Sequence, residues 1–476
     1  MGVLSTLSID NLHYEKYADG TMKCIEDEIP FEAPDGWEWA RLGSIAEADL
    51  GKMLDAAKNK GLPRPYLRNI NVRWGVFDLT DLLEMRIQDE EVERYSVLKG
   101  DLVVCEGGEP GRCAIWEAEN GVFFQKALHR VRPHLVSSEY VFLVIYALSL
   151  SGLMERYFTG TTIKHLTGQA LKALLIPIPP IHEQGRICGA ANKALDIVDD
   201  IEENKEVLVS TLSLAKSRIL DLAIRGLLVP QNPDDEPASV LLDRICKEKE
   251  MLIKHGKIKR DKRESIIFRG DDNSYYEKIG DEVSCIDDEL PYDIPEGWAW
   301  CELQQCCVKE IKRGRSPKYA EKGQVLSFAQ KCNQKNGGIN IRLALWIDDA
   351  TIGRYNEDEY MRDGDIIINS TGTGTLGRVG VYHSSDNPSA IPIVPDSHVT
   401  VVRASGYVHP SYLYFCLKAM QSSIENMGEG STNQKELKPP TIQQLRIPLP
   451  PYAEQIMICK RVHTMLTTVS MIEAEL

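Results

Sequence analysis

The 476-residue sequence lacks the cysteine spacing, the long apolar runs and the leader that mark several protein classes. Its twelve cysteines form no C-x-x-C pair, and the spacing of Cys301, Cys306 and Cys307 fits no common zinc site. The longest apolar stretches, such as residues 141–148, are too short to span a bilayer. Residues 1–6 lack the basic and apolar regions of a secretion signal. We therefore expect buried, reduced thiols, no metal site and a cytoplasmic location.

Positive charge is also in deficit, and the usual catalytic motifs are missing. Lys and Arg number 55 against 70 Asp and Glu, which gives a formal net charge of −15. This balance argues against a nucleic-acid binder that relies on overall charge, but it does not exclude local basic faces. The sequence has no H-E-x-x-H helix and no G-x-S-x-G turn. Leu449 precedes Pro450-Pro451-Tyr452, where an adenine methyltransferase needs Asn or Asp, so we predict a chain that is not itself an enzyme.

The chain contains an internal duplication with a period of roughly 265 residues. Residues 44–99 and 304–363, which lie between the repeated segments, show little resemblance to each other. Two copies that share these repeated segments but differ between them predict two similar domains with different binding specificities. The repeated segments are Cys24-Ile25-Glu26-Asp27 with Cys285-Ile286-Asp287-Asp288, Gly36-Trp37 with Gly297-Trp298, Gly100-Asp101 with Gly364-Asp365, and Pro180 to Gln184 with Pro451 to Gln455.

Length and duplication together predict the architecture. At roughly 100–200 residues per domain, the chain holds two to four domains. Strand-like and helical runs in each copy, such as 121–124 and 138–156, predict a mixed α/β fold. We predict two duplicated α+β domains separated by two long antiparallel coiled-coil helices, in a pseudo-twofold arrangement. The expected parts are a first globular copy, a central helical spacer with linker, a second globular copy and a final spacer helix, at residues 1–180, 181–260, 261–451 and 452–476.

A helix is expected after each Pro-Pro pair, because proline is accepted in the first helical turn. Apolar residues then recur in steps of three and four, which is the period of a coiled-coil seam. We expect the two helices to pair with each other; otherwise each packs on its own domain or faces another protein. The seam residues of the first helix are Ile187, Ala191, Ala194, Val198, Ile201, Leu208, Leu212 and Ile219, and those of the second are Ile458, Val462, Met465, Val469 and Ile472.

Both dissimilar segments carry clusters of side chains suited to reading DNA. Arg pairs bidentately with guanine and Asn or Gln with adenine, while Lys mostly meets phosphates. A single member is more readily explained as an ion-paired surface residue, so the clusters carry the prediction. The candidates are Arg64, Arg68, Asn69, Asn71, Arg73, Lys126 and Arg130 in the first copy, and Arg313, Arg315, Lys318, Lys331, Asn333, Gln334 and Lys335 in the second.

A glycine-rich loop in the second copy, residues 370–378, matches the pattern G-x-G-x-x-G. Nucleotide binding is not expected there, because Arg378-Val379 stand where a phosphate loop needs Lys-Ser/Thr and a strand follows in place of a helix. The loop is either a tight turn or a place where Thr373 and Arg378 approach a DNA backbone. The first copy keeps the glycines and an arginine, Arg112, but lacks the threonines.

The ordered set of segments resembles the DNA specificity subunits of type I restriction–modification enzymes. The resemblance covers nearly the whole chain. It implies two target recognition domains that each read one half of a bipartite site, and two helices that set the spacing, about one DNA turn or 34 Å. The segments that carry it are Gly36 to Trp39, Tyr66 to Val72, Gly100 to Leu102, Gly372 to Arg378, Ile219 to Gln231 and both Pro-Pro-x-x-Glu-Gln helix starts.

The resemblance also implies partners that supply the chemistry. Modification subunits, docked on the helices, would hold S-adenosylmethionine and methylate adenine. Restriction subunits would use ATP and Mg to translocate and cut double-stranded DNA. This chain would hold no cofactor and no metal. The final helix is shorter than the first, which departs from the duplication and puts equal docking of two modification subunits in doubt.

Two other functions fit parts of the sequence. A self-contained methyltransferase or nuclease with a fused recognition domain would itself bind S-adenosylmethionine or cut DNA with a metal. A scaffold that does not bind DNA would offer basic segments, such as residues 247–269, to acidic partners, although such a tract can also be a solvated face. Salt-sensitive, sequence-selective binding of duplex DNA separates the leading hypothesis from the scaffold.

Overall fold

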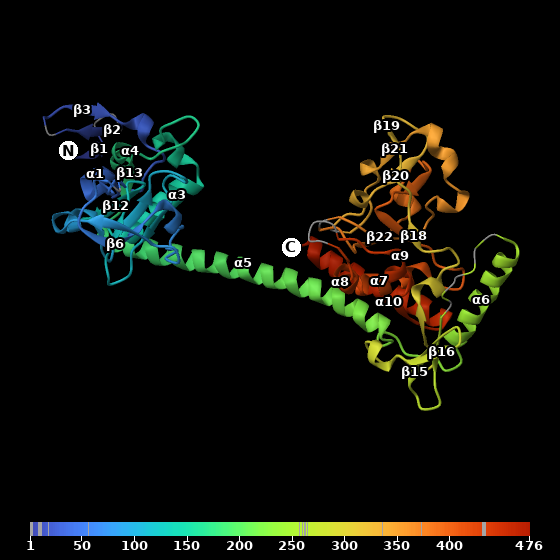
Figure 1. Ribbon diagram of the computed structural model, residues 1–476. Coiled ribbons are helices and arrows are strands. Elements are labelled where there is room, and N and C mark those ends of the chain that lie inside the picture. The colour runs from blue at the N-terminus through green and yellow to red at the C-terminus, as the bar shows by residue number, and fades with distance from the viewer. Residues whose placement is uncertain are drawn as a thin grey trace. The chain divides into compact units, whose positions relative to one another are not determined.

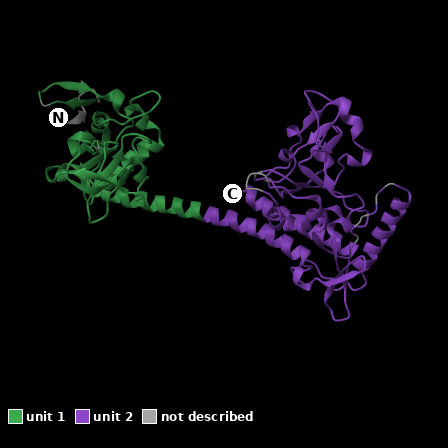
Figure 2. Cartoon of the chain, in the orientation of Figure 1, with its two compact units in different colours: residues 1–203 green, residues 204–476 purple. Residues whose placement is uncertain are grey.

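The computed structural model describes the chain except residues 1, 2, 8–11, 18, 56, 257, 259, 261, 262, 264, 336, 373 and 431–434. The described chain forms two compact units, residues 1–203 and 204–476 (Figure 2). Each unit contains one copy of the duplicated sequence, and each copy folds as mixed helices and sheets, as predicted (Figure 1). No helix in the described part of the chain combines the length and the apolar character needed to cross a lipid bilayer.

Unit 1 contains two four-stranded sheets, of order β10-β9-β12-β5 and β7-β6-β11-β8. The first is antiparallel, and in the second β11 runs parallel to β6. A three-stranded sheet and the β4–β13 ladder complete the unit. The strands are β1 Val3–Leu7, β2 His13–Lys16, β3 Met22–Cys24, β4 Glu38–Arg41, β5 Ala46–Leu50, β6 Leu62–Leu67, β7 Leu83–Ile87, β8 Ser96–Val97, β9 Leu102–Cys105, β10 Cys113–Ile115, β11 Val122–Phe124, β12 Leu128–Pro133 and β13 Leu175–Ile178.

Unit 2 repeats this topology except in its second sheet, where the fourth strand β19 pairs with β21, whereas in unit 1 the fourth strand β8 pairs with β11. Its sheets have the orders β23-β22-β25-β18 and β19-β21-β20-β24, with β20 parallel to β24, and a three-stranded sheet and the β17–β26 ladder accompany them. The strands are β14 Ser265–Arg269, β15 Tyr275–Ile279, β16 Glu282–Cys285, β17 Ala299–Glu302, β18 Lys312–Arg313, β19 Tyr319–Ala320, β20 Leu326–Phe328, β21 Leu345–Ile347, β22 Ile366–Asn369, β23 Val379–Val381, β24 Ile393–Pro395, β25 Val399–Val402 and β26 Arg446–Leu449.

Local sequence signals explain where some of the helices end. Predicted helix 138–156 stops at Leu150, because Gly152 turns the chain with a φ of 74° and a short 3-10 turn follows. Residues 410–426 form two helices, α7 and α8. The helices are α1 Leu42–Ile45, α2 Val92–Tyr95, α3 Ser138–Leu150, α4 Gly168–Ala173, α5 Ile181–Ile224, α6 Ala238–Lys254, α7 Pro410–Ala419, α8 Gln421–Asn426, α9 Pro439–Gln443 and α10 Tyr452–Ala474.

Strand β9 lies between two hydrophobic clusters. Leu102 and Val104 face the cluster that contains α3, while Val103 and Cys105 face the second sheet. Both faces of the strand are therefore buried, which explains its continuous apolar sequence. Strand β22 repeats the arrangement in unit 2 with a run of isoleucines.

The two spacer helices pair antiparallel inside unit 2. Leu212 and Ile219 of α5 are buried, and Ile219 shares a core cluster with Ile458 and Val462 of α10. Lys216 of α5 forms an ion pair with Glu473 near the end of α10. Gln231, after α5, reaches Glu454 at the start of α10. The predicted pairing is therefore confirmed for the C-terminal half of α5.

The predicted pairing of the two helices does not extend to the middle of α5, which α10 leaves uncovered. Val198, Ile201 and Leu208 are 49, 61 and 37% exposed, and Ala194 is exposed as well. Ile187 packs on the core of unit 1 instead. Helix α10 has 23 residues against 44 in α5, so it covers only the later turns. At its own end Ile472 is 42% exposed, while Met465 and Val469 are partly buried against α5 and the core.

Candidate nucleic-acid interface

A buried aspartate anchors the same turn in both units. In unit 1, the two carboxylate oxygens of Asp101 accept hydrogen bonds from Arg132, both at 2.7 Å. In unit 2, those of Asp365 accept from Arg403 at 2.7 and 2.6 Å. Each carboxylate also accepts from a backbone amide of its turn. These hydrogen bonds explain the repeated Gly-Asp pair, and they fix the sheet from which the candidate readers project. The sequence analysis missed both arginines.

Arg112 and Arg378, which follow the two glycine loops, have equivalent partners within their own units. Arg112 donates to the carbonyl oxygen of Asn69 at 2.9 Å, and Arg378 donates to that of Asn333 at 2.8 Å. Each arginine therefore ties its glycine loop to a short turn, the one that follows β6 in unit 1 and the one that follows β20 in unit 2. Both guanidinium groups are half-buried, so their first role is to position the loop.

The glycine loop of unit 2 is a tight turn packed on its own domain. Gly372 has a φ of 102°, and a Cβ on it would lie 2.4 Å from the side chain of Gln330. Strand β23 follows the loop, as predicted, so no helix N-terminus is present to hold a phosphate. Thr373, the threonine predicted to approach DNA, lies outside the described residues.

Three of the predicted readers lie inside their domains. Asn71, Arg130 and Asn333 are only 2, 3 and 1% exposed. All three donate to backbone carbonyl oxygens, and Arg130 also reaches the carboxylate of Asp49 at 3.0 Å. Their donors are used within the fold, so the assignment of these three to DNA contact does not fit the structure and is corrected to a positioning role.

Two predicted readers of unit 1 hold exposed carboxylates. Arg64 pairs with Asp89 at 3.3 Å and Arg68 with Asp81 at 2.6 Å. The side chains of Asp89 and Asp81 are 87 and 68% exposed, so water screens both pairs. A DNA phosphate can therefore replace either carboxylate at small cost. The guanidinium of Arg64 also lies 5.5 Å from the ring centre of Phe123, which holds it in place.

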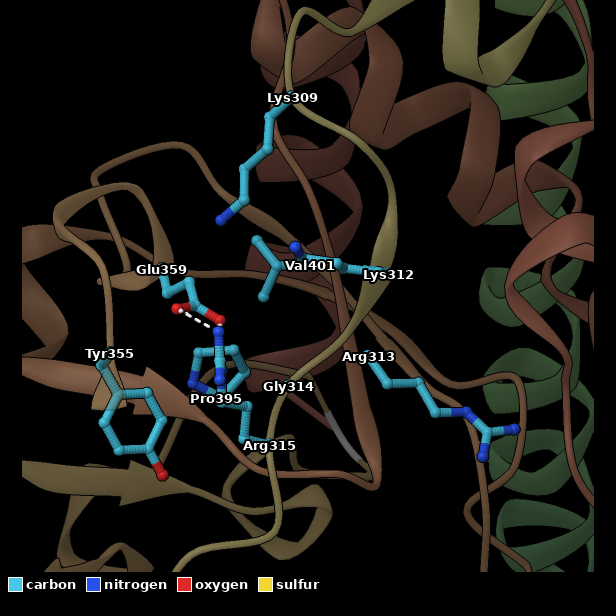
Figure 3. A pocket seen from close by; sticks show the side chains of 9 residues that line it. All are labelled: Lys309, Lys312, Arg313, Gly314, Arg315, Tyr355, Glu359, Pro395 and Val401. Atoms are coloured by element: carbon cyan, nitrogen blue, oxygen red, sulfur yellow. Dashed lines mark hydrogen bonds and ion pairs between the residues drawn. The ribbon is translucent and has the colours of Figure 1, made fainter. Parts of the chain in front are cut away.

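Unit 2 offers a basic hollow beside β18 (Figure 3). Arg315 points into it and contacts Glu359 with two hydrogen bonds, at 2.8 and 3.1 Å. The Glu359 side chain is only 9% exposed, and Arg315 helps to hold its pKa below the usual value against the opposing effect of burial. Arg313 points away from the hollow and meets Glu436 at 3.0 Å. The Arg313 side chain is 22% exposed and also donates to the carbonyl oxygen of Leu437, whereas that of Arg315 is 42% exposed.

The hollow also includes Lys309, a cation that the sequence analysis did not select. Lys309 lines it from the loop before β18. Burial, and then the neighbouring Arg403, lower the pKa of Lys309. An approaching phosphate would favour its protonated form. Only its place in the fold reveals this residue, since a lone lysine in a loop carries no sequence signal.

The remaining candidates lie at the surface. Asn69 and Gln334 are half-buried, whereas the lysines and the arginine of this group are exposed. Lys318 has an ion pair with Asp348 at 3.0 Å. The exposed members are Arg73, Lys126, Lys318, Lys331 and Lys335.

The thiols and the basic tract have mainly structural surroundings. Most cysteines are buried, as expected, but Cys24, Cys246 and Cys285 are exposed. No three His, Cys, Asp or Glu side chains come together as a metal site within the described ranges. Part of the basic tract lies on α6, where Lys249 donates to a carbonyl oxygen of unit 2, while Lys257, Lys259 and Lys262 lie outside the described residues.

The duplicated frame corresponds to a known family. The family model described as the type I restriction modification DNA specificity domain matches residues 34–209 and 295–476. The chain belongs to this family. The two matched ranges are the two copies, so the chain is a specificity subunit with two DNA specificity domains, and it recognises DNA sequence. Each match also runs from its domain into the following spacer helix.

Two relatives of this specificity subunit come from Escherichia coli. The chain is 25% identical to the type I restriction enzyme EcoEI specificity subunit of Escherichia coli, over 92% of this chain and 79% of the relative. It is 26% identical to the EcoAI specificity subunit of Escherichia coli, over 72% of this chain and 63% of that relative, less than two thirds of its length.

Two solved structures share the fold of the specificity subunit. One is from work on complex assembly and conformational transition of the type I R-M system, with a TM-score of 0.60, 17% identity and 94% of both chains covered. The other is the HsdS subunit from Thermoanaerobacter tengcongensis, with a TM-score of 0.53, 17% identity, and 94 and 93% of the chains covered. At this identity the likeness concerns the fold, and it supports the predicted pair of duplicated domains.

Proposed function

We propose that the chain is the non-catalytic DNA-reading subunit of a type I restriction–modification complex in the cytoplasm. Each recognition domain reads one half of a bipartite site in double-stranded DNA. The helices set the spacing and dock modification subunits. Methylation with S-adenosylmethionine belongs to those subunits, and cleavage with ATP and Mg belongs to restriction subunits.

One observation carries this proposal. The two domains share the strand order of the antiparallel four-stranded sheet and internal hydrogen bonds, yet the segments between the shared elements differ in sequence. The shared strands and hydrogen bonds form a similar scaffold in both domains. The dissimilar segments present different side chains from that scaffold. Such a pair of frames suits the reading of two different base sequences, because base edges differ only in their donors, acceptors and methyl groups.

Phosphate contacts would set the register, and side chains in residues 60–135 and 310–405 would read base edges. The surface residues suited to this are Arg73 and Lys126 in unit 1 and Lys331 and Lys335 in unit 2, all exposed. Arg64, Arg68 and Arg313 would join them by exchanging carboxylates for phosphates. This division gives each domain its own positively charged contacts despite the acidic chain.

An exchange of segments tests the proposal. Residues 44–135 are replaced by the corresponding segment of another family member, and methylated adenines are mapped in a genome that carries the complete system. One half of the methylated site should change while the other stays. A change in both halves, or in neither, would contradict separate reading. An exchange of residues 304–405 is the matched control, and it should alter the opposite half.

Two biochemical results would favour the alternatives. Binding of S-adenosylmethionine or metal-dependent cleavage by the purified chain would indicate a self-contained methyltransferase or nuclease. Failure to bind any duplex in a sequence-selective and salt-sensitive way, even with modification subunits present, would indicate a scaffold that does not act on DNA.

A further inference from the structure

The antiparallel sheets of the two units differ in charge at one equivalent position. Gly51 and Gly314 follow the edge strands β5 and β18, and a Cβ on these glycines would lie 2.3 and 2.0 Å from a backbone carbonyl oxygen. This close approach to the neighbouring backbone fixes the alignment of the two strands. Two residues before the glycine, unit 1 has Asp49 and unit 2 has Lys312. Unit 2 therefore has a cation where unit 1 has an acid.

The residue across the ladder differs as well, and this difference opens the hollow beside β18. In unit 1, Arg130 lies across from Asp49 and donates to its carboxylate at 3.0 Å. The buried Arg130 also donates to one carbonyl oxygen in α2 and to one in β8, at 3.2 and 2.8 Å. In unit 2, Val401 lies across from Lys312 and lines the hollow. Unit 2 thus has a hollow where unit 1 has a buried arginine.

Unit 2 also lacks the segment that covers this place in unit 1. Glu91 and Glu359 correspond, because each closes a short 3-10 turn and pairs with the basic residue that follows the glycine. From Glu91 to Asp101 the chain advances ten residues and forms α2 and β8. From Glu359 to Asp365 it advances six, and the described residues 360–364 form neither helix nor strand. The hollow is therefore open to an approaching group.

The hollow has more cations than acids. Lys309, Lys312 and Arg315 line it, and its one lining carboxylate, on Glu359, is already held by Arg315 (Figure 3). Each lysine has its ion-pair partner 3.8 Å away, on an acid that is more than half exposed. Lys309 donates in addition to one backbone carbonyl oxygen. Burial lowers the pKa of Lys309, as expected for an ammonium group without a close counterion. An anion in the hollow would supply that counterion.

We propose that the hollow beside β18 holds one phosphate group of the DNA backbone through Lys309 and Lys312. The free space in the hollow suits about one water-sized atom, which matches a phosphate oxygen and excludes a base or a sugar. The contact belongs to unit 2, since Arg130 fills the equivalent place in unit 1. The inference rests on the proposed function, because DNA supplies the phosphate. It adds a site that positions unit 2 on the backbone without reading bases.

Duplexes with single neutral methylphosphonate links test this contact on the full chain assembled with its modification subunits. One link is placed in turn at each phosphate of the mapped site, and binding is measured for the parent and for Lys312→Gln. One link, at the half that the segment exchange assigns to unit 2, should weaken binding of the parent about tenfold, because a charge-assisted hydrogen bond is lost. The same link should leave binding of Lys312→Gln unchanged. If the variant loses as much as the parent at every link, the proposal is overturned.

Matched variants separate a phosphate contact from a structural role. The Lys312 side chain is 44% exposed on an edge strand, so its replacement spares the fold. Lys312→Gln should lower the slope of log K against log salt by about 1 and leave the methylated sequence unchanged, because a phosphate contact carries no base information. Lys312→Arg should restore the parent slope, and Lys278→Gln, at an exposed position of β15, should keep it. A parent slope in Lys312→Gln would contradict the proposal.

A free phosphate ion is the other source of the same chemistry. Calorimetry of the full chain with inorganic phosphate, without DNA, distinguishes the two sources. If inorganic phosphate binds the parent and not Lys312→Gln, while both bind DNA equally, the hollow serves a free anion and the proposal is overturned. A parent complex without sequence-selective binding would contradict the proposed function itself. Selective binding that is the same for parent and Lys312→Gln at every link and salt concentration would contradict the phosphate site and leave the proposed function standing.

Discussion

Arg446 lies directly opposite Glu302 in the ladder of β17 and β26. At the same place in the ladder of β4 and β13, Arg41 lies opposite Leu175. The arginine is thus on the second strand of the ladder in unit 2 and on the first strand in unit 1. The charged arginine therefore lies on opposite strands of the ladder in the two copies.

Both arginines nevertheless reach corresponding carboxylates. Each bridges a glutamate of the three-stranded sheet and a glutamate of the 3-10 turn that follows it. A position on either strand of the ladder therefore gives access to the same pair of acids, so the ion-pair cluster is retained while the sequence varies. The ion pairs are Arg41 with Glu15 at 3.0 Å and Glu28 at 2.7 Å, and Arg446 with Glu277 at 2.8 Å and Glu289 at 3.5 Å.

Loss of Arg446 should destabilise unit 2. In Arg446→Gln the Glu277 side chain, 6% exposed, keeps its charge without its cation, and removal of one partner of such a pair costs about 3 kcal/mol. Urea unfolding of the full chain measures the change. The control, Lys99→Gln, removes a pair with side chains 58 and 82% exposed and should cost less than about 1 kcal/mol. Similar losses for both variants would contradict the assigned role.

Glu302, which lies opposite Arg446, should make the stability of the chain depend on pH. Burial raises the pKa of Glu302 in the folded chain, with Arg263 nearby acting against the shift. A raised folded pKa means that stability is greatest below the unfolded pKa, about 4.3, and falls as pH rises through the folded value. Glu302→Gln removes this loss. Its stability relative to the parent should therefore increase between pH 4 and neutral pH, as measured by urea unfolding across that range; a constant difference would disprove the assignment.

The buried Asp–Arg pairs should stabilise their own units. Asp365→Asn removes the charge that Arg403 meets with two hydrogen bonds, and we expect a loss of about 2 kcal/mol. Limited proteolysis should then cut unit 2 faster and leave unit 1 unchanged, whereas Asp101→Asn should do the reverse. Asp196→Asn, on an exposed turn of α5, is the control and should change neither. Equal acceleration of cutting in both units by Asp365→Asn would contradict a local effect.

The exposed candidates should contribute to DNA binding, whereas the buried candidates should contribute to stability. Lys331→Ala with Lys335→Ala should weaken binding of the assembled complex, and the slope of log K against log salt should fall by about 1 for each phosphate that is no longer neutralised. Lys278→Ala, exposed on β15 away from the variable segment, is the matched control and should keep the parent slope.

The buried Asn333 provides the contrast. Asn333→Ala should lower the stability of unit 2, because Asn333 joins the glycine loop to β22 through hydrogen bonds to Asn369 and to the backbone of Arg378. If the Asn333→Ala chain folds with unchanged stability but loses a base preference, the result would indicate that Asn333 contacts bases directly. Circular dichroism and binding to a panel of sites distinguish these results.

The sequence by itself determined the duplication, the mixed fold of each copy and the starts of α5 and α10. These follow from local chemistry: repeated segments persist in order, and a Pro-Pro pair ends a strand and opens a helix. The apolar seam also identified Ile219 and Ile458 as members of a helix pair. The family resemblance rested on the same ordered segments.

The tertiary structure alone decided which candidates face solvent and which part of α5 has a helical partner. Asn71, Arg130 and Asn333 have side chains suited to reading bases, but Asn71 and Asn333 are buried at short 3-10 turns and Arg130 on β12, and residue type does not specify which side chains the fold turns inward. The two dissimilar segments share the antiparallel pairs β6–β7 and β20–β21, each with a parallel partner, because backbone hydrogen bonds define strand pairing, while many side-chain sets satisfy the same core. The contact of Gln231 with Glu454 joins residues that are distant in the chain, which no local pattern records.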